Sequence, residues 1–316
     1  MPLCTVNRYS DQFLLDSYTG KGGYLTGAYL VPHAREDDEA FKERGVVAIY
    51  PNYTADIVNT YLGYLWKKTP SRDVGDGYNR FLLNADGAGN SLDFCLSSYQ
   101  NLSLVLGTVW IIVDRPQGIP ATRAQQADPY LAVRMPAQVV NVRFDALGVL
   151  DSITFAETET SMSMPQIQLA GQSANTWFGS FINWIGFGGE QRYRHFDKQG
   201  WKITLDAAGK AVLAQGEHKL GMVPVVPLHS SKTLLPGQLR ADPWAFGTIQ
   251  NNWGLYNQVS EKRTLFRKQA FSLLTIPVID DNDAQRLQDL TLGTDNALTY
   301  NPQGGGQPAY ISPQDG

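Results

Sequence analysis

The stretch LGMVPVVPLHSS, residues 220–231, constrains the fold more than any other part of this sequence. It is apolar, and it contains Pro224 and Pro227. Proline has no amide hydrogen and a fixed φ, so these residues cannot lie in the middle of a helix or of a central strand. The stretch therefore predicts a rigid apolar edge or crossover segment.

A long helix is predicted shortly after this segment. Asp242 and Pro243 supply an N-cap residue and a proline suited to the first helical turn, and the next proline is Pro277. Apolar residues at helical spacing form one seam along the first part of this stretch. The predicted helix begins at Asp242 and ends at Leu274.

The second half of the predicted helix is basic. It carries Lys262, Arg263, Arg267 and Lys268 against the single acidic residue Glu261. Such a band could contact phosphates. It is also typical of a solvated surface, because basic residues suit the C-terminal half of a helix. The residues themselves leave both interpretations open.

Three further helices are predicted ahead of the proline-containing stretch. The first is charge-rich and exposed and ends at Gly45, and the others have apolar residues at steps of three and four. In the second of them, a seam of Ile57, Tyr61, Tyr64 and Leu65 is expected to face the core. Residues 1–30 show little periodicity and several glycines, which predicts an extended or loop-rich entrance. The predicted helices span residues 33–45, 54–68 and 91–107.

Short β-rich runs separated by turn residues follow the third helix. Their spacing predicts strands with antiparallel neighbours. The predicted strands lie at residues 108–114, 130–135, 139–144, 150–156, around Tyr193, at 201–205 and at 211–215. With the helices on either side, the whole chain reads as an α+β protein.

Composition and charge limit the classes of function that this chain could have. The 316 residues are 43% hydrophobic and 18% charged, as in ordinary globular proteins. The net charge of −4 repels nucleic acid unless basic residues gather in one place. Cys4 and Cys95 are too few for a disulfide framework and lack the spacing of zinc ligands. Neither a secretory leader nor a membrane span is expected.

Motifs for catalysis or for cofactor binding are not recognisable. The four histidines have no metal-ligand spacing, and the glycine-rich pieces match neither a phosphate-binding loop nor a dinucleotide fingerprint. We therefore expect no cofactor and no metal ion. Carboxylates are plentiful, as in Glu157 with Glu159 and Asp280 with Asp281, so an acid and base pair acting on a carbohydrate stays open.

Four stretches of the chain, taken in order, resemble portal proteins of tailed bacteriophages. The last of them joins LGMVPVVPLHSS to DPWAFGTIQNNWGLYNQVSEKRTLFRKQAFSLLTIPVI, and it resembles the family's element of Gly-x-x-Pro-hydrophobic-x-Pro before a helix. The first three are YLTGAYLVPHAREDDEAFKERGVVAIYPNYTADIVNTYLGYLWKKTP, LVLGTVWIIVDRP and DPYLAVRMPAQVVNVRFDALGVLDSITFAE. Together the four stretches cover most of the chain.

This resemblance implies a mixed wing domain of antiparallel strands and helices at residues 1–235. A long stem helix follows at 236–274, and a small clip-like α/β tail at 275–316. Portal proteins are not enzymes. They form homo-oligomeric rings, usually of twelve subunits, at one capsid vertex of the virion, and the ring passes DNA during packaging and ejection. The implied partners are further copies of the chain, double-stranded DNA bound without sequence preference, the terminase large subunit, the head-tail adaptor, and capsid and scaffolding proteins. Assembly would take place in the host cytoplasm.

The resemblance also gives roles to two sets of residues on the stem helix. The candidates for lining or flanking the DNA channel are Lys262, Arg263, Arg267 and Lys268. The candidates for packing against neighbouring subunits are Phe246, Ile249, Trp253 and Tyr256. The proline-containing stretch would orient this helix relative to the wing.

One departure from the family pattern concerns the end of the chain. In portal proteins the clip is followed by a second stem helix, a tunnel loop, a long wing helix and a crown, and these do not appear before Gly316. A truncated product or a partial homology would explain this. Two alternative functions stay open from the residues alone, namely a β-rich carbohydrate-active enzyme with paired carboxylates and a generic oligomeric scaffold unrelated to DNA.

Overall fold

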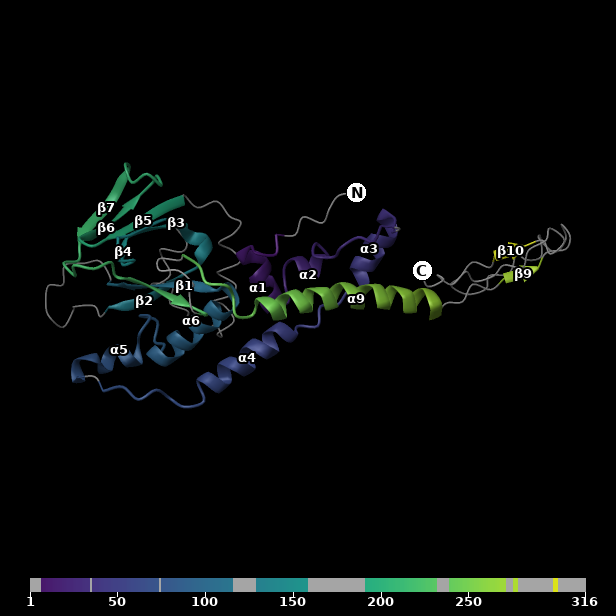
Figure 1. Ribbon diagram of the computed structural model, residues 1–316, viewed down its shortest axis with the longest axis horizontal. Coiled ribbons are helices and arrows are strands. Elements are labelled where there is room, and N and C mark those ends of the chain that lie inside the picture. Colours follow the sequence, from purple (N-terminus) through teal and green to yellow (C-terminus); the bar gives the residue numbers. More distant parts are fainter. Residues whose placement is uncertain are drawn as a thin grey trace. The chain divides into compact units, whose positions relative to one another are not determined.

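The computed structural model describes residues 7–34, 36–73, 75–115, 129–158, 191–231, 239–270, 275–277 and 298–300 (Figure 1). The chain divides into two compact units. The first unit consists of Met1–Tyr29 and Tyr50–Leu255, and the second of Leu30–Ile49 and Tyr256–Gly316. Helices and antiparallel sheets are both present, which confirms the predicted α+β class.

Two short helices occupy the N-terminal part of the first unit. Helix α1 (Asp11–Thr19) begins where the Ser10 side chain accepts a hydrogen bond from the amide of Phe13. It ends at Gly20, which has a left-handed backbone. Helix α2 (Gly23–Thr26) follows. The prediction of an extended or loop-rich entrance is therefore wrong, because a serine cap and a glycine end define a helix too short to show clear periodicity.

Helices α4 (Tyr53–Leu65) and α6 (Leu92–Leu106) confirm two of the predicted helices. Ser91 caps α6 and Cys95 is buried, as the spacing of apolar residues predicts. In α4, however, the buried residues are Thr54 and Val58. The seam expected to face the core is on the exposed side, so that prediction is wrong. Between them lie the 3-10 turn η1 (Asp76–Tyr78) and helix α5 (Asn79–Leu83).

The strands form two antiparallel sheets in the first unit. Strands β1 (Thr108–Asp114), β2 (Tyr130–Arg134) and β8 (Val225–His229) pair in the order β2-β1-β8. The other sheet is a five-stranded meander that runs through β3 to β7 in sequence order, with the 3-10 turn η3 (Pro136–Gln138) ahead of it. Its strands are β3 (Val139–Phe144), β4 (Leu150–Thr158), β5 (Gln191–Asp197), β6 (Gly200–Thr204) and β7 (Val212–Glu217). These strands agree with the predicted ones.

The proline-containing stretch becomes the edge strand β8. Pro227 stands opposite Trp110 of the central strand β1, and among the described strands β8 pairs with β1 alone. An edge position tolerates the missing amide hydrogen, since that side of the strand needs no ladder partner. The predicted apolar edge is confirmed.

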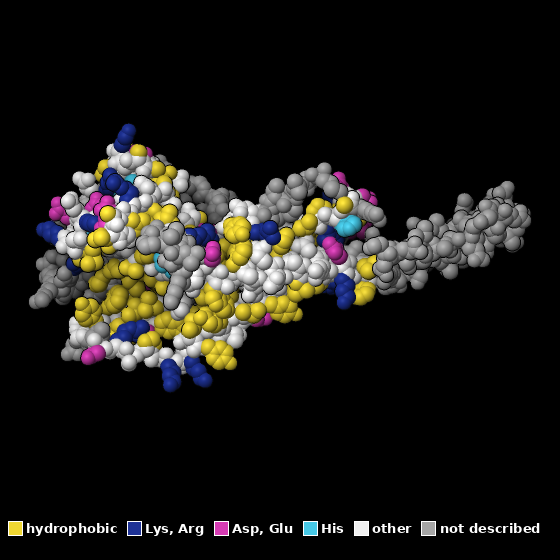
Figure 2. All heavy atoms as spheres, in the orientation of Figure 1, with side chains coloured by type: hydrophobic (Ala, Val, Ile, Leu, Met, Phe, Trp, Pro, Cys, Tyr) yellow, Lys and Arg dark blue, Asp and Glu magenta, His cyan; other side chains and the backbone are white. Residues whose placement is uncertain are grey.

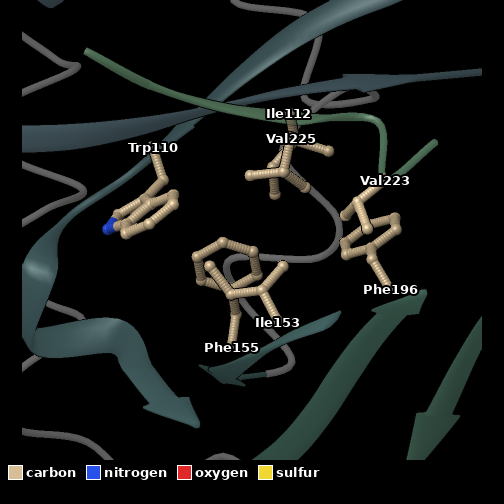
Figure 3. Packing of buried hydrophobic residues seen from close by; sticks show 7 residues of the cluster. All are labelled: Trp110, Ile112, Ile153, Phe155, Phe196, Val223 and Val225. Atoms are coloured by element: carbon tan, nitrogen blue, oxygen red, sulfur yellow. The ribbon is translucent and has the colours of Figure 1, made fainter. Parts of the chain in front are cut away.

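The two sheets share one hydrophobic core. Figure 3 shows seven side chains from both sheets and from the residues next to β8 pointing toward one another. Phe155 and Phe196 meet edge to face with their ring centroids 6.4 Å apart. The cluster consists of Trp110, Ile112, Ile153, Phe155, Phe196, Val223 and Val225.

Helix α9 (Phe246–Ala270) is the 25-residue helix that the sequence predicts after β8. It begins in the first unit, and its second half belongs to the second unit. The predicted start at Asp242 and Pro243 is wrong, because the backbone up to Ala245 forms a turn and the helix begins at Phe246. The predicted end at Leu274 lies outside the described residues.

The second unit also contains helix α3 (Asp38–Val47). Asp37 caps its start, and the helix continues past Gly45, where the sequence predicts its end. Gly45 has no left-handed backbone, so it does not act as a terminator. Strands β9 (Thr275–Pro277) and β10 (Leu298–Tyr300) pair in parallel. The rest of the predicted clip-like tail lies outside the described residues.

Candidate functional site

The chain that leads into α9 is fixed to the turn between α6 and β1. The Thr108 hydroxyl accepts a hydrogen bond from the amide of Ala241 at 2.9 Å. The amide of Ala245 donates to the Leu104 carbonyl at 3.0 Å, and Arg240 Nε donates to the Leu106 carbonyl at 3.1 Å. Three bonds to one turn therefore define where the long helix starts.

Gly107 lies at the centre of this turn. Its φ of 89° belongs to the left-handed region that favours glycine. A Cβ at this position would collide with the carbonyl oxygen of Ala241. The absence of a side chain thus allows the segment before α9 to approach the turn closely.

The end of β8 joins the same junction. The amide of Ser230 donates to the Gly107 carbonyl at 2.8 Å, and its hydroxyl donates to the Asp242 carbonyl at 2.9 Å. Arg240 forms an ion pair with Asp11 at 2.7 Å. The end of the proline-containing edge strand and the segment before α9 are consequently held at one point, and the predicted role of this strand in orienting the helix stays a prediction.

The apolar seam of α9 is already engaged within the chain. In the first unit, Ile249 is buried, Phe246 stacks on Tyr9, and Trp253 Nε1 donates to the Tyr29 carbonyl at 2.8 Å. In the second unit Tyr256 is buried. The predicted packing of these residues between subunits stays a prediction, and it concerns only the partly exposed sides of Phe246 and Trp253.

The basic band of α9 is exposed to solvent. The side chains of Lys262, Arg263 and Arg267 are all exposed, and that of Lys268 is outside the described part of the chain. Lys262 Nζ lies 5.3 Å from the centre of the Phe266 ring. Among the described residues, no carboxylate lies within ion-pair distance of these three cations. In the described part of the chain their side chains face solvent.

A buried arginine fixes the segment 30–49 against the second half of α9, within the second unit. Arg44 pairs with both oxygens of Glu36, at 2.7 and 2.8 Å, and it also donates to Ser260 Oγ of α9 at 2.9 Å. Nη2 of Arg44, which also bonds Glu36 Oε2, donates to the Val31 carbonyl at 2.7 Å. The Val31 amide in turn donates to Asn257 Oδ1 at 2.8 Å. The hydrogen bonds from Arg44 keep the pKa of Glu36 below its ordinary value.

We expect the variant Arg44→Met to loosen this part of the second unit. It removes a fully buried charge and leaves Glu36 without its counter-charge, which costs roughly 3 kcal/mol, or about a hundredfold faster amide exchange in α3. Hydrogen exchange of the α3 amides measures this directly. Lys42→Met is the matched control, because Lys42 is exposed on the same helix. Equal exchange rates in the two variants would contradict the structural role of Arg44.

Glu157 is the carboxylate that the sequence offers for carbohydrate chemistry, but it is fully buried. Its Oε1 lies 2.7 Å from Arg134 Nη2, and its Oε2 lies 3.4 Å from Arg194 Nε. Burial alone would raise the pKa of Glu157, yet the two arginines outweigh it and lower the pKa. A carboxylate held ionised and shielded from solvent is unsuited to donating a proton to a substrate. Its predicted partner Glu159, and the pair Asp280 and Asp281, lie outside the described residues.

Glu157 is one member of a larger ionic network between the two sheets. Arg194 of β5 also contacts Asp114 of β1 at 2.6 Å, and the same Asp114 oxygen accepts a hydrogen bond from Tyr130 of β2 at 3.2 Å. With Arg134 of β2 and Glu157 of β4, the network links four strands. Sequence reasoning missed it. The feature of the sequence that could have indicated this network is a set of charged residues within or at the ends of otherwise apolar strands.

The described histidines are placed apart from one another. His195 of β5 lies 2.8 Å from the hydroxyls of Thr154 and of Thr204, and His229 lies 2.8 Å from Thr108 Oγ1. Burial lowers the pKa of both. In the described ranges, His, Cys, Asp and Glu side chains form no group of three that could hold a metal ion. None of the helices described there is both long and apolar enough to cross a bilayer.

In comparisons with known proteins, no family model matches this chain, and no curated protein is significantly similar to it.

Proposed function

We propose that this chain is a subunit of a portal-type ring, with α9 as the helix that faces DNA. The observation that carries the proposal is the exposed basic band on the second half of a 25-residue helix. Such a helix is about 37 Å long. On this proposal the residues up to 235 are the wing, α9 belongs to the stem, and residues 275–316 form the clip-like region.

Two features, one in each unit, support this proposal. The segment before α9 is tied by hydrogen bonds to the end of α6, to Thr108 at the start of β1 and to Ser230 just after β8, so the start of the helix is fixed in the first unit. In addition, Lys262, Arg263 and Arg267 are not neutralised by described carboxylates, although the chain is acidic overall. Contacts from a few such cations to phosphates are individually weak, which would let DNA slide past.

The burial of Glu157 weighs against one of the two alternatives, and the salt dependence of DNA binding tests the other. A carbohydrate-active enzyme based on Glu157 would need this carboxylate to reach a substrate, and it is buried between two arginines. A scaffold unrelated to DNA would leave the basic band as a solvated helix surface. It predicts that DNA affinity is independent of these cations.

We expect the triple variant Lys262→Gln, Arg263→Gln, Arg267→Gln to weaken binding to duplex DNA of any sequence. Each lost phosphate contact lowers the slope of log affinity against log salt by about 0.9, so three contacts lower it by roughly 3. Fluorescence anisotropy of a labelled duplex across a salt series measures the slope.

The control is a variant with the same change of net charge at exposed lysines elsewhere, namely Lys42→Gln, Lys210→Gln, Lys219→Gln. Its slope should equal that of the unmodified chain. If both triple variants have the same slope, α9 is not the DNA-binding element. Negative-stain images of the purified chain test the ring itself. Particles without a central hole would contradict a portal-type assembly.

A further inference from the structure

The most apolar side of helix α4 faces solvent. Tyr53, Ile57, Tyr61, Tyr64 and Leu65 are all exposed, and Tyr64 retains 73% of its accessible surface. We call these five residues the α4 stripe. Figure 2 shows hydrophobic side chains over this helix, with basic side chains gathered at one end of it. A helix in a globular protein normally turns such a side toward its core.

Polar contacts hold α4 in this orientation. On its inner side, Thr54 and Val58 are buried, and Asn59 Oδ1 accepts a hydrogen bond from the Tyr18 hydroxyl at 2.7 Å. At its end, Trp66 Nε1 donates to Gln100 Oε1 of α6 at 2.8 Å. Thr54 and Val58 are thus the buried side chains of α4, while all five residues of the stripe are exposed.

Trp244 extends the stripe into a surface of the composition expected for an interface. Trp244 stacks on Tyr61 with ring centroids 4.3 Å apart, and it is itself 39% exposed. Aromatic residues, above all Tyr and Trp, are enriched at the centres of protein interfaces. At about 200 Å² for a fully exposed side chain of this size, the stripe exposes roughly 500 Å², close to the largest apolar patch of a typical monomer.

The charges that flank the stripe point to a second copy of the same chain as the partner. Asp56 is exposed near the start of α4, and Lys67 and Lys68 are exposed just beyond its end. When two α4 helices pair in antiparallel orientation about Tyr61, Ile57 of each copy lies opposite Leu65 of the other. Asp56 of each copy then lies within one helical turn of the two lysines of the other, so the ends attract.

We propose that the chain self-associates through the α4 stripe, with the two helices antiparallel around a two-fold axis. About 800 Å² per partner is buried in a standard interface, so an apolar centre of roughly 500 Å² with a charged rim has the required size. A two-fold contact joins two copies and then closes. It cannot by itself build a ring, and the proposal is therefore independent of the function proposed above.

Sedimentation of the purified full chain tests the surface. We expect the unmodified chain to associate, and the variant Ile57→Ser, Tyr64→Ser to raise the dissociation constant at least about tenfold. Leu147→Ser is the control, since Leu147 is 87% exposed in the turn between β3 and β4. A chain that stays monomeric at micromolar concentration, or a stripe variant that associates like the control, would overturn the proposal.

Charge exchange tests the antiparallel arrangement without altering apolar residues. Asp56→Lys alone and the pair Lys67→Asp, Lys68→Asp alone should each weaken association, because like charges then face each other across the axis. Combined in one chain, the three changes should restore it. Weakening that is not restored would exclude this arrangement. The two proposals fail separately. If these variants still form ring-shaped particles in negative stain, loss of the two-fold contact does not contradict the portal-type proposal.

Discussion

Replacing Glu157 with glutamine is expected to lower the free energy of unfolding of the first unit by roughly 3–5 kcal/mol. The change keeps the size of the side chain but removes the negative charge shared by Arg134 and Arg194. All three side chains are buried or nearly so, and solvent cannot replace the lost charge. Urea denaturation followed by tryptophan fluorescence measures the difference.

The matched control is Asp151→Asn at a solvent-exposed ion pair of the same sheet. Asp151 lies 3.3 Å from Lys198, and both side chains are more than a third exposed. Exposed pairs contribute about 0–1 kcal/mol, so this variant should unfold almost as the unmodified chain does. A Glu157→Gln variant as stable as Asp151→Asn would show that the network does not hold the two sheets together.

The carboxylate of Glu157 should also make the free energy of unfolding depend on pH in the acidic range. In the folded chain the pKa of Glu157 is below its ordinary value, because the arginine charges outweigh the effect of burial. A lowered pKa contributes stability that is fully present above about pH 4.3, the value for an unperturbed glutamate, and is lost as the pH falls toward the folded pKa. Unfolding midpoints measured between neutral pH and pH 3 should therefore fall less steeply for Glu157→Gln than for the unmodified chain.

The variant Gly107→Ala is expected to cost at least about 3 kcal/mol. Alanine pays about 1–2 kcal/mol for a left-handed backbone, and its Cβ would also collide with the Ala241 carbonyl. Relief of the collision would have to displace the segment that leads into α9. Thermal unfolding should show a melting temperature lower by roughly 6–12 °C.

Gly89→Ala separates the two causes. Gly89 also has a positive φ, of 98°, but no atom lies within 4 Å of the position its Cβ would take. It should therefore show the backbone cost alone. If Gly107→Ala destabilises the chain no more than Gly89→Ala, the close approach at the junction has no energetic importance.

Most elements of the first unit were predictable because their signals are local. Helix α6 has its cap at Ser91, a regular apolar spacing and Gly107 at its end, and all three agree. The strand runs are bounded by turn residues, and Pro224 and Pro227 restrict β8 to a sheet edge. Helix α1 was missed because nine residues show too little periodicity, although its serine cap and terminal glycine were visible.

The candidate site was predictable only in part. The exposed cations of α9 follow from a cluster of basic residues in a helix. Helical spacing also identified the stripe of α4, but it assigned the stripe to the core. Periodicity shows which residues share a side of a helix and does not show what covers that side. The network around Glu157 gave no periodic signal at all.

The sequence by itself determined the local elements of this protein, because caps, prolines and apolar spacing act over a few residues. Only the tertiary structure decided that α4 leaves its apolar stripe uncovered, that Glu157 is buried between two arginines, and that α9 starts at Phe246. These outcomes depend on contacts between distant residues, such as the bond from Ala241 to Thr108, which are 133 positions apart. Which of the possible long-range contacts form depends on the packing of the whole chain, so short stretches of sequence do not reveal them.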